Sequence, residues 1–387
     1  MMKDLRLTPK QRAAVSKLER DSFAEHCRRF NYSPAEHERS LLAQSKDELR
    51  VMLSIQNRGD KDLPQEVIEA TRDYLGAPDY WTYKRLQNRD EVMDAATDIA
   101  AIAPSLPINW PYVHNVAREY GIALPVAQQP DSIVSFVTSI PHIVFFGNEF
   151  DAFVTRLKML DDVPAVCMFE QLIASTTDFI DVVMMRVLVQ KSESEVDIAE
   201  QERWDTIGKD AAFVENLGGA IDMILARRDW VSHPSNFLLS RSGPQMPLSA
   251  SLMFMGAADF VRRHEYGHLL RGHLNQPQHP RIEFEADNFA MTVMASKELY
   301  GASFWYKAGA IAVIVMLMIG EAIDGPSPAG THPHARDRLA ALLSRDSDEN
   351  LMLFGVAQAI LGICRPTLAS TYGIRQTVDD LMRVRPI

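Results

Sequence analysis

The segment that decides the fold is SASLMFMGAADFVRRHEYGHLLRGHL, which runs from Ser249 to Leu274. We interpret it as one continuous helix that contains His264, Glu265 and His268 in the order H-E-x-x-H. Because residues four apart lie on the same helix face, His264 and His268 present two imidazoles to one point. Two such nitrogens suit a tetrahedral zinc ion. Glu265 lies about 100° round the helix, beside the metal, where it can take a proton from an attacking water.

A second acidic segment, EFEADNFA, begins at Glu283, fifteen residues after His268. Glu283 and Asp287 are four apart and share a helix face. Glu283 can therefore supply a third metal ligand, and Asp287 can accept a hydrogen bond from the free ring nitrogen of a ligating histidine. Glu285 would point about 200° away from Glu283, so only one of the two glutamates can face the metal. By itself the segment would also fit a solvated helix face; after an H-E-x-x-H helix it favours a metal site.

His273 is a rival ligand, because it follows His268 by only five residues. At that spacing its side chain is rotated off the ligand face. A metzincin would need glycine three residues and histidine six residues after the second ligand. Arg271 and Leu274 occupy those positions, so the sequence excludes that arrangement.

The two motifs resemble the gluzincin metallopeptidases, and most of all the HtpX and CAAX-prenyl-endopeptidase group, whose pattern is H-E-x-x-H followed by E-x-x-A-D. A third segment, THPHARDRL from Thr331 to Leu339, resembles the T-H-P-x-x-x-x-R-[IL] segment of that group. A weaker likeness is to the soluble bacterial ImmA/IrrE peptidases and the Lit-type phage-exclusion peptidase. The resemblance covers Val261 to Leu339, and it implies a soluble relative because the spanning helices of the group are missing.

The resemblance implies a zinc-dependent endopeptidase that cleaves a protein or peptide substrate. His264, His268 and Glu283 would bind Zn²⁺, with Asp287 behind them, and Glu265 would be the general base. An alternative is a latent protein that keeps the zincin fold but stays catalytically silent until an activating or inhibiting protein partner acts on it. A structural helical protein that carries the motif by accident is the other alternative.

The histidine of the third segment, His332, falls where the family places a residue close to the site. It could donate a hydrogen bond to the oxyanion of the tetrahedral intermediate, and so act catalytically. It could also reach the metal and occlude its open position, or be an ordinary loop residue. Arg338 fits a clamp on a carboxylate better than a catalytic role. His233 is a weaker oxyanion candidate.

The expected fold is mainly α (α+β): a zincin-like metallopeptidase core with a small sheet, preceded by an N-terminal helical region. We expect residues 1–110 to form a helical accessory or regulatory region and residues 111–387 to form the metallopeptidase domain. Caps and prolines predict helices that start at Thr8, Ser33 and Pro64. The segment 131–146 fits strands or a helix split at Pro141.

Two further segments, 165–190 and 196–230, have helical patterns. In zinc peptidases of this class an extended substrate commonly pairs with a sheet edge beside the metal. Phe237 to Leu239 and Ile143 to Phe146 are the candidates for that edge.

Composition narrows the partners and the location. The formal net charge of −11 and pI of about 5.5 oppose binding to phosphate backbones, so we expect no nucleic-acid partner. The three cysteines are far apart, which indicates a reducing, cytoplasmic location. The N-terminus has no apolar signal segment. The longest uncharged apolar run, Ala308 to Gly320, is shorter than the roughly 20 residues that span a bilayer, so we predict a core helix and no membrane span.

Overall fold

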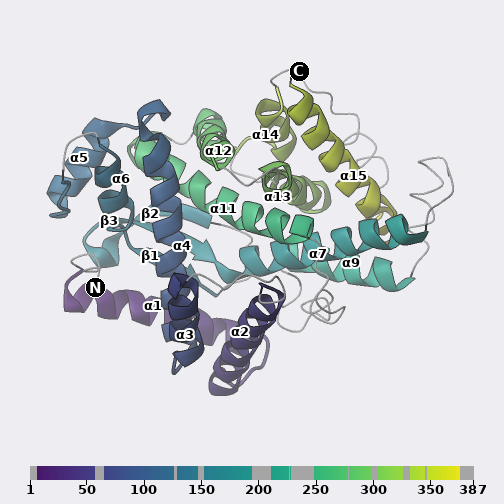
Figure 1. Ribbon diagram of the computed structural model, residues 1–387, viewed down its shortest axis with the longest axis horizontal. Coiled ribbons are helices and arrows are strands. Elements are labelled where there is room, and N and C mark those ends of the chain that lie inside the picture. Colours follow the sequence, from purple (N-terminus) through teal and green to yellow (C-terminus); the bar gives the residue numbers. More distant parts are fainter. Residues whose placement is uncertain are drawn as a thin grey trace.

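The computed structural model is mainly helical, with one three-stranded sheet in the part of the chain that it describes (Figure 1). This confirms the expected mainly α class. The described residues are 7–56, 65–125, 129–146, 152–193, 211–225, 227, 248–277, 279–297, 303–325, 332–344 and 347–374.

The helices before the sheet are α1 (Pro9–Arg29), α2 (Pro34–Gln56), α3 (Gln65–Gly76), α4 (Tyr80–Ile102), η1 (Ala103–Ser105), α5 (Trp110–Glu119) and α6 (Pro130–Val137). The sheet contains β1 (His142–Phe145), β2 (Ala152–Leu157) and β3 (Val163–Phe169), with η2 (Lys158–Leu160) between the last two. After the sheet, the described part of the chain contains α7 (Glu170–Glu193), α9 (Ala211–Ile224), α11 (Leu248–Arg271), η5 (His273–Asn275), α12 (Pro280–Ala295), α13 (Ser303–Asp324), α14 (Ala335–Leu342) and α15 (Asp348–Thr371).

The first three helices begin where caps and prolines predict. Thr8 closes a capping box with Gln11 at the start of α1. Pro34 is the first residue of α2, and α3 starts directly after Pro64. Asp79 caps α4 by accepting a hydrogen bond from the backbone N–H of Thr82.

The sheet has the order β1-β3-β2, in which β1 is parallel and β2 antiparallel to β3. The segment 131–146 combines both alternatives, because α6 ends before Pro141 and β1 follows it. The prediction that residues 165–190 are helical is wrong at its start, since Ala165 to Phe169 belong to β3 and the helix begins at Glu170. An apolar run that is buried on both faces of a strand has no period that distinguishes it from a buried helix.

Helix α1 covers the outer edge of β1. The backbone N–H of Val144 donates to Oε1 of Glu19 at 3.4 Å, and that of Phe146 donates to the hydroxyl of Ser22 at 3.2 Å. Side chains of α1 therefore accept hydrogen bonds from backbone donors of Ile143 to Phe146, the edge that was predicted to pair with a substrate. The other candidate edge, Phe237 to Leu239, lies outside the described residues.

Helix α11 lies at the centre of the molecule and crosses α13 at very short range (Figure 1). Gly256 of α11 and Gly309 of α13 are the contact points, because a Cβ on either would overlap the backbone of the other helix. The run Ala308 to Gly320 is almost entirely buried in α13, as predicted for a core helix. By length and apolar composition α13 and α15 could each cross a membrane; the most apolar stretch of α13 is 67% buried and that of α15 is 50% buried.

Charged side chains join α4 to α11. Arg263 is fully buried and bonds to Asp98 of α4 and to Tyr306 of α13, with Asp259 one turn away on its own helix. Arg262 pairs with Glu91 of α4 in the same way. Helix α4 is thus anchored to the helix that carries the H-E-x-x-H motif. The division of the chain at that residue stays a prediction.

Candidate metal centre

The end of α11 is set by Gly272 and by the start of α5. Gly272 has φ +72°, and a Cβ there would lie 2.9 Å from the ring of Tyr112. The backbone N–H of Asn109 donates to the carbonyl of Leu270, and its side-chain amide donates to that of Arg271. The helix therefore ends at Arg271, three residues before the predicted end, because the left-handed glycine turns the chain.

Helix α12 then returns the acidic segment to the face of α11 that carries the histidines. His279 caps it and Pro280 is its first residue. Nε2 of His264 lies 3.0 Å from Nε2 of His268 and 3.3 Å from Oε2 of Glu283. Nε2 of His268 lies 3.6 Å from Oε1 of the same carboxylate. The three ligand atoms lie within 4.8 Å of one another, close enough to hold one metal ion.

Asp287 and Arg338 support this group from behind. The ring Nδ1 of His264 lies 2.9 Å from Oδ1 of Asp287, which is the contact that the shared helix face predicts. Arg338 donates to both oxygens of Asp287, from Nε at 2.8 Å and from Nη2 at 2.6 Å. Burial alone would raise the pKa of Asp287, but the Arg338 guanidinium outweighs it and lowers that pKa to about 2. Arg338 is therefore the carboxylate clamp that sequence reasoning expected.

The two histidines have opposite electrostatic settings. Burial, and then the neighbouring His264, lower the pKa of His268 to about 3, so its imidazole is neutral and keeps a lone pair. Burial also opposes charge on His264, but hydrogen bonds to Asp287 and Glu283 reverse the effect and raise its pKa. One proton on His264 then balances the carboxylates, and a bound cation would replace that proton.

Glu265 is buried, with 4% of its surface exposed, and it follows His264 on α11. Burial raises the pKa of the Cys167 thiol to about 12, and the negative charge of Glu265 adds to that shift. Glu265 also raises the pKa of Arg338, although burial lowers it and Asp287 has the larger raising effect. The charge of its carboxylate therefore acts on both Cys167 of β3 and Arg338 of α14.

His332 lies beside Glu283, with its Nδ1 3.3 Å from Oε1 of that carboxylate, and its side chain is 55% exposed. The position is next to the three ligand atoms and open to solvent. Glu285 points away from them, as the helix arithmetic predicts, and it bonds to Arg271 and Arg281. His233 lies outside the described residues.

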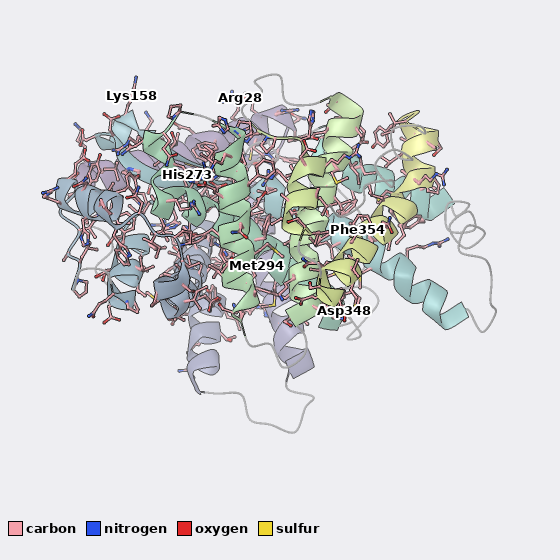
Figure 2. The ribbon with its side chains drawn as sticks, turned by 90° about the horizontal axis from the view of Figure 1, so that it is seen from above. Arg28, Lys158, His273, Met294, Asp348 and Phe354 are labelled. Atoms are coloured by element: carbon pink, nitrogen blue, oxygen red, sulfur yellow. The ribbon has the colours of Figure 1, made fainter. Side chains whose placement is uncertain are left out.

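Three neighbours of the motif were not anticipated from the sequence. His273, treated there only as a rival ligand, contacts His268 (Figure 2 labels it). His142 of β1 lies 2.8 Å from the hydroxyl of Tyr266 on the opposite side of α11. Strand β2 lies against α11 and η5, where Arg156 reaches the side chain of Asn275. The adjacent residues Phe153, Val154 and Thr155, all of types enriched in strands, are the feature that could have indicated this strand.

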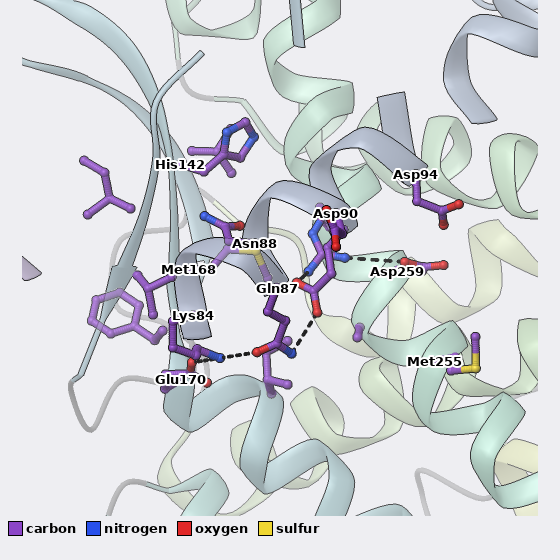
Figure 3. A pocket seen from close by; sticks show the side chains of 18 of the residues that line it. Lys84, Gln87, Asn88, Asp90, Asp94, His142, Met168, Glu170, Met255 and Asp259 are labelled. Carbon is purple, nitrogen blue, oxygen red and sulfur yellow. Dashed lines mark hydrogen bonds and ion pairs between the residues drawn. The ribbon is translucent and has the colours of Figure 1, made fainter. Parts of the chain in front are cut away.

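A cavity of about 350 Å³ lies on that opposite side, between α4, the sheet and the first half of α11 (Figure 3). His142, Met168 and Asp259 line it, and none of the three ligand residues does. Burial, followed by the charge of Arg262, lowers the pKa of His142 to about 3, so its imidazole is neutral there. The cavity is therefore separate from the metal-binding group.

Comparison with known proteins adds one finding. A family model described as Peptidase U49 matches residues 178–353, a span that includes the H-E-x-x-H motif, the acidic segment of α12 and His332. No curated protein and no solved structure matches the chain. The match supports a peptidase family for the part of the chain that carries the candidate metal centre.

Proposed function

We propose that the protein is a zinc-dependent endopeptidase of the gluzincin type, with a zincin-like core, that hydrolyses peptide bonds in a protein substrate. One observation carries the proposal: side-chain atoms of His264, His268 and Glu283 converge, and the buried Glu265 directly follows His264 on α11. The convergence lies inside the span that matches a peptidase family. Two imidazoles and one carboxylate, with a position left open, are the donor set of catalytic zinc sites.

The same three side chains would hold the ion. The chemistry that zinc supplies at such a site is polarisation of a carbonyl oxygen and acidification of a water. Glu265 takes the proton of the attacking water and passes it to the leaving nitrogen. Its burial shields the carboxylate from bulk water during that transfer. His332 is partly exposed and contacts the carboxylate of Glu283. We assign to it the hydrogen bond to the oxyanion.

Strand β2 is the best-placed edge for an extended substrate. It is antiparallel to its neighbour, and its outer position in the described sheet leaves all six residues partly exposed. It also lies against α11 and η5, where Arg156 reaches the side chain of Asn275. Backbone pairing along such an edge would orient the scissile bond toward the metal-binding group. This replaces β1, whose outer donors are taken by α1.

A latent regulatory protein with the same fold is the second candidate. The contact between His332 and Glu283 favours it, because a histidine that reaches the open metal position would restrain the enzyme until a partner moved it. A cytoplasmic location belongs to the proposal in either case; it rests on Cys27, Cys167 and Cys364, which are buried and form no disulfide in the described part of the chain.

The test uses the full-length chain and its metal content. Wild type should contain about one zinc per chain, and His264→Ala, His268→Ala or Glu283→Ala should each lose most of it. Glu265→Gln should keep the fold and the zinc but lower the rate on the order of 10² to 10⁴-fold. Glu215→Gln, at an exposed position of α9, is the matched control and should behave as wild type.

Since the substrate is unidentified, turnover is measured on casein and as new protein N-termini in cells that express wild type or Glu265→Gln. A zinc-free wild type would refute the proposed metal site. Undiminished cleavage by Glu265→Gln would refute the base assignment. A zinc-loaded wild type that produces no new N-termini, alone or with cell extract, would favour a silent protein.

A further inference from the structure

We propose that His273 and Glu285 form a histidine relay that positions His268, by determining which of its ring nitrogens faces the metal. The relay consists of Glu285, His273 and His268. The inference rests on the proposed metal centre. It assigns a role to His273 and Glu285, which supply none of the three ligand atoms.

The contacts run in one line. Nε2 of His273 lies 3.2 Å from Oε2 of Glu285, and Nδ1 of His273 lies 3.0 Å from Nδ1 of His268. Glu285 is itself held by Nη2 of Arg271 at 2.5 Å and by Nε of Arg281 at 2.8 Å. His273 is buried, with 4% of its surface exposed, so water does not compete freely for its ring nitrogens.

The direction of the hydrogens follows from the carboxylate end. An ionised carboxylate only accepts, so Nε2 of His273 carries the hydrogen that it donates to Glu285. A neutral imidazole has one N–H, so Nδ1 of His273 is left as an acceptor. Nδ1 of His268 must then donate to it, and Nε2 of His268 keeps the lone pair. That lone pair is on the nitrogen that lies beside His264 and Glu283.

The same outcome is reached on the other ligand by a shorter route. Nδ1 of His264 meets Asp287 directly, and Arg338 holds that carboxylate. Each ligating imidazole is thus backed by a carboxylate that arginine fixes, directly in one case and through His273 in the other. A hydrogen bond of this kind fixes the tautomer and the ring orientation of a metal-binding histidine.

Gly272 makes the longer route feasible. Its left-handed backbone ends α11 and starts η5, which brings His273 back beside His268 with ring centroids 5.0 Å apart. On a continued helix a residue five positions on would point away from the ligand face. The turn therefore converts a histidine that sequence spacing excludes as a ligand into a partner of one.

The experiment compares His273→Leu with His273→Asn. Leucine removes the acceptor, whereas the asparagine side-chain oxygen can occupy the position of Nδ1 and accept from His268. We expect His273→Leu to raise the dissociation constants of zinc and cobalt by roughly 10- to 100-fold. We also expect it to change the visible spectrum of the cobalt form. His273→Asn should recover most of both. His114→Leu, the same substitution on α5, is the control and should match wild type.

A second readout needs no metal and no turnover. Nitrogen NMR of histidine-labelled protein, with His268 assigned by a His268→Gln variant, should show the Nδ1–H form of His268 in metal-free wild type. The same spectrum should show mixed tautomers in His273→Leu. Unchanged metal affinity, cobalt spectrum and tautomer in His273→Leu would overturn the relay. Equal losses in the leucine and asparagine variants would also overturn it, since they would indicate ring packing instead of an acceptor.

Failure of the relay and failure of the proposed function give different results. A wild type that binds zinc and follows the relay pattern, yet cleaves nothing, would refute the peptidase proposal and keep the relay. A wild type that binds no metal would refute the proposed metal centre, and the tautomer measurement would then support or overturn the relay by itself.

Discussion

Gly309→Ala tests how closely α11 and α13 are packed. A Cβ at Gly309 would lie 2.0 Å from the carbonyl oxygen of Met253 and 2.6 Å from the backbone nitrogen of Ala257. Both atoms belong to the backbone of α11, so neither can rotate away. Gly256 shows the reciprocal contact, with its added Cβ 1.8 Å from the carbonyl oxygen of Tyr306. The two helices would have to separate to admit a single methyl group.

The size of the separation gives the expected loss. Real Cβ atoms essentially never lie closer than 3.0 Å to such a neighbour. The distance from the added Cβ to the Met253 oxygen would therefore have to grow from 2.0 Å by 1.0 Å. A gap of 0.5–1 Å already forfeits about a quarter to a half of each dispersion contact along the interface. Overpacking of this kind costs about 1–3 kcal/mol or more. That exceeds the gain of about 0.8–1.0 kcal/mol that alanine brings to a helix interior, so Gly309→Ala should destabilise the protein.

The matched control lies on the same helix. Gly320 of α13 has no described atom within 4 Å of an added Cβ, so Gly320→Ala should gain up to about 1 kcal/mol from helix propensity alone. Urea unfolding of the full-length chain, followed by circular dichroism, should give midpoints below wild type for Gly309→Ala and at or above it for Gly320→Ala. Equal or higher stability of Gly309→Ala would refute the close crossing. Zinc content should fall as well, because α11 carries two of the proposed ligands.

Two further predictions concern protonation and His332. Burial raises the pKa of Glu19 from 4.5 to about 7, against smaller lowering effects of the Val144 N–H and Arg85. The folded protein holds this proton more tightly than the unfolded chain, so the contribution is complete below about pH 4.5 and is lost as the pH rises through 7. Wild type should lose at most about 3 kcal/mol over that range relative to Glu19→Gln; parallel pH profiles of unfolding would contradict this. If His332 donates to the oxyanion, His332→Ala should lower kcat about 10² to 10³-fold with little change in KM. Higher basal activity of this variant would show instead that His332 blocks the metal. Unchanged kinetics with zinc intact would make His332 an ordinary loop residue.

Local spacing in the sequence was sufficient to predict the faces of the two central helices. His264 and His268 share one face of α11, and Glu283 and Asp287 share one face of α12, because a helix repeats every 3.6 residues whatever surrounds it. The same helical repeat correctly predicted that Glu285 points away from the ligand atoms, toward Arg281. The apolar run Ala308 to Gly320 was predicted to be a core helix, and it is almost entirely buried in α13.

The tertiary structure decided which faces meet. Nothing local to Glu283 indicates that it lies 3.3 Å from His264; that distance depends on how α12 packs against α11. The contact of His273 with His268 depends on a left-handed Gly272 that the first residues of α5 surround, more than 150 positions earlier in the chain.

The conformation of the sheet strands was also decided by tertiary structure. The segment from Ala165 to Phe169 has no period that separates a buried strand from a buried helix, so its pairing with β1 and β2 determined its conformation. Likewise, β1 is an edge strand by order, but α1 covers that edge, and this leaves β2 as the edge strand that lies against α11 and η5. Periodicity is a property of neighbouring residues, whereas edges, clamps and relays arise where distant segments pack together, so only the folded chain determines them.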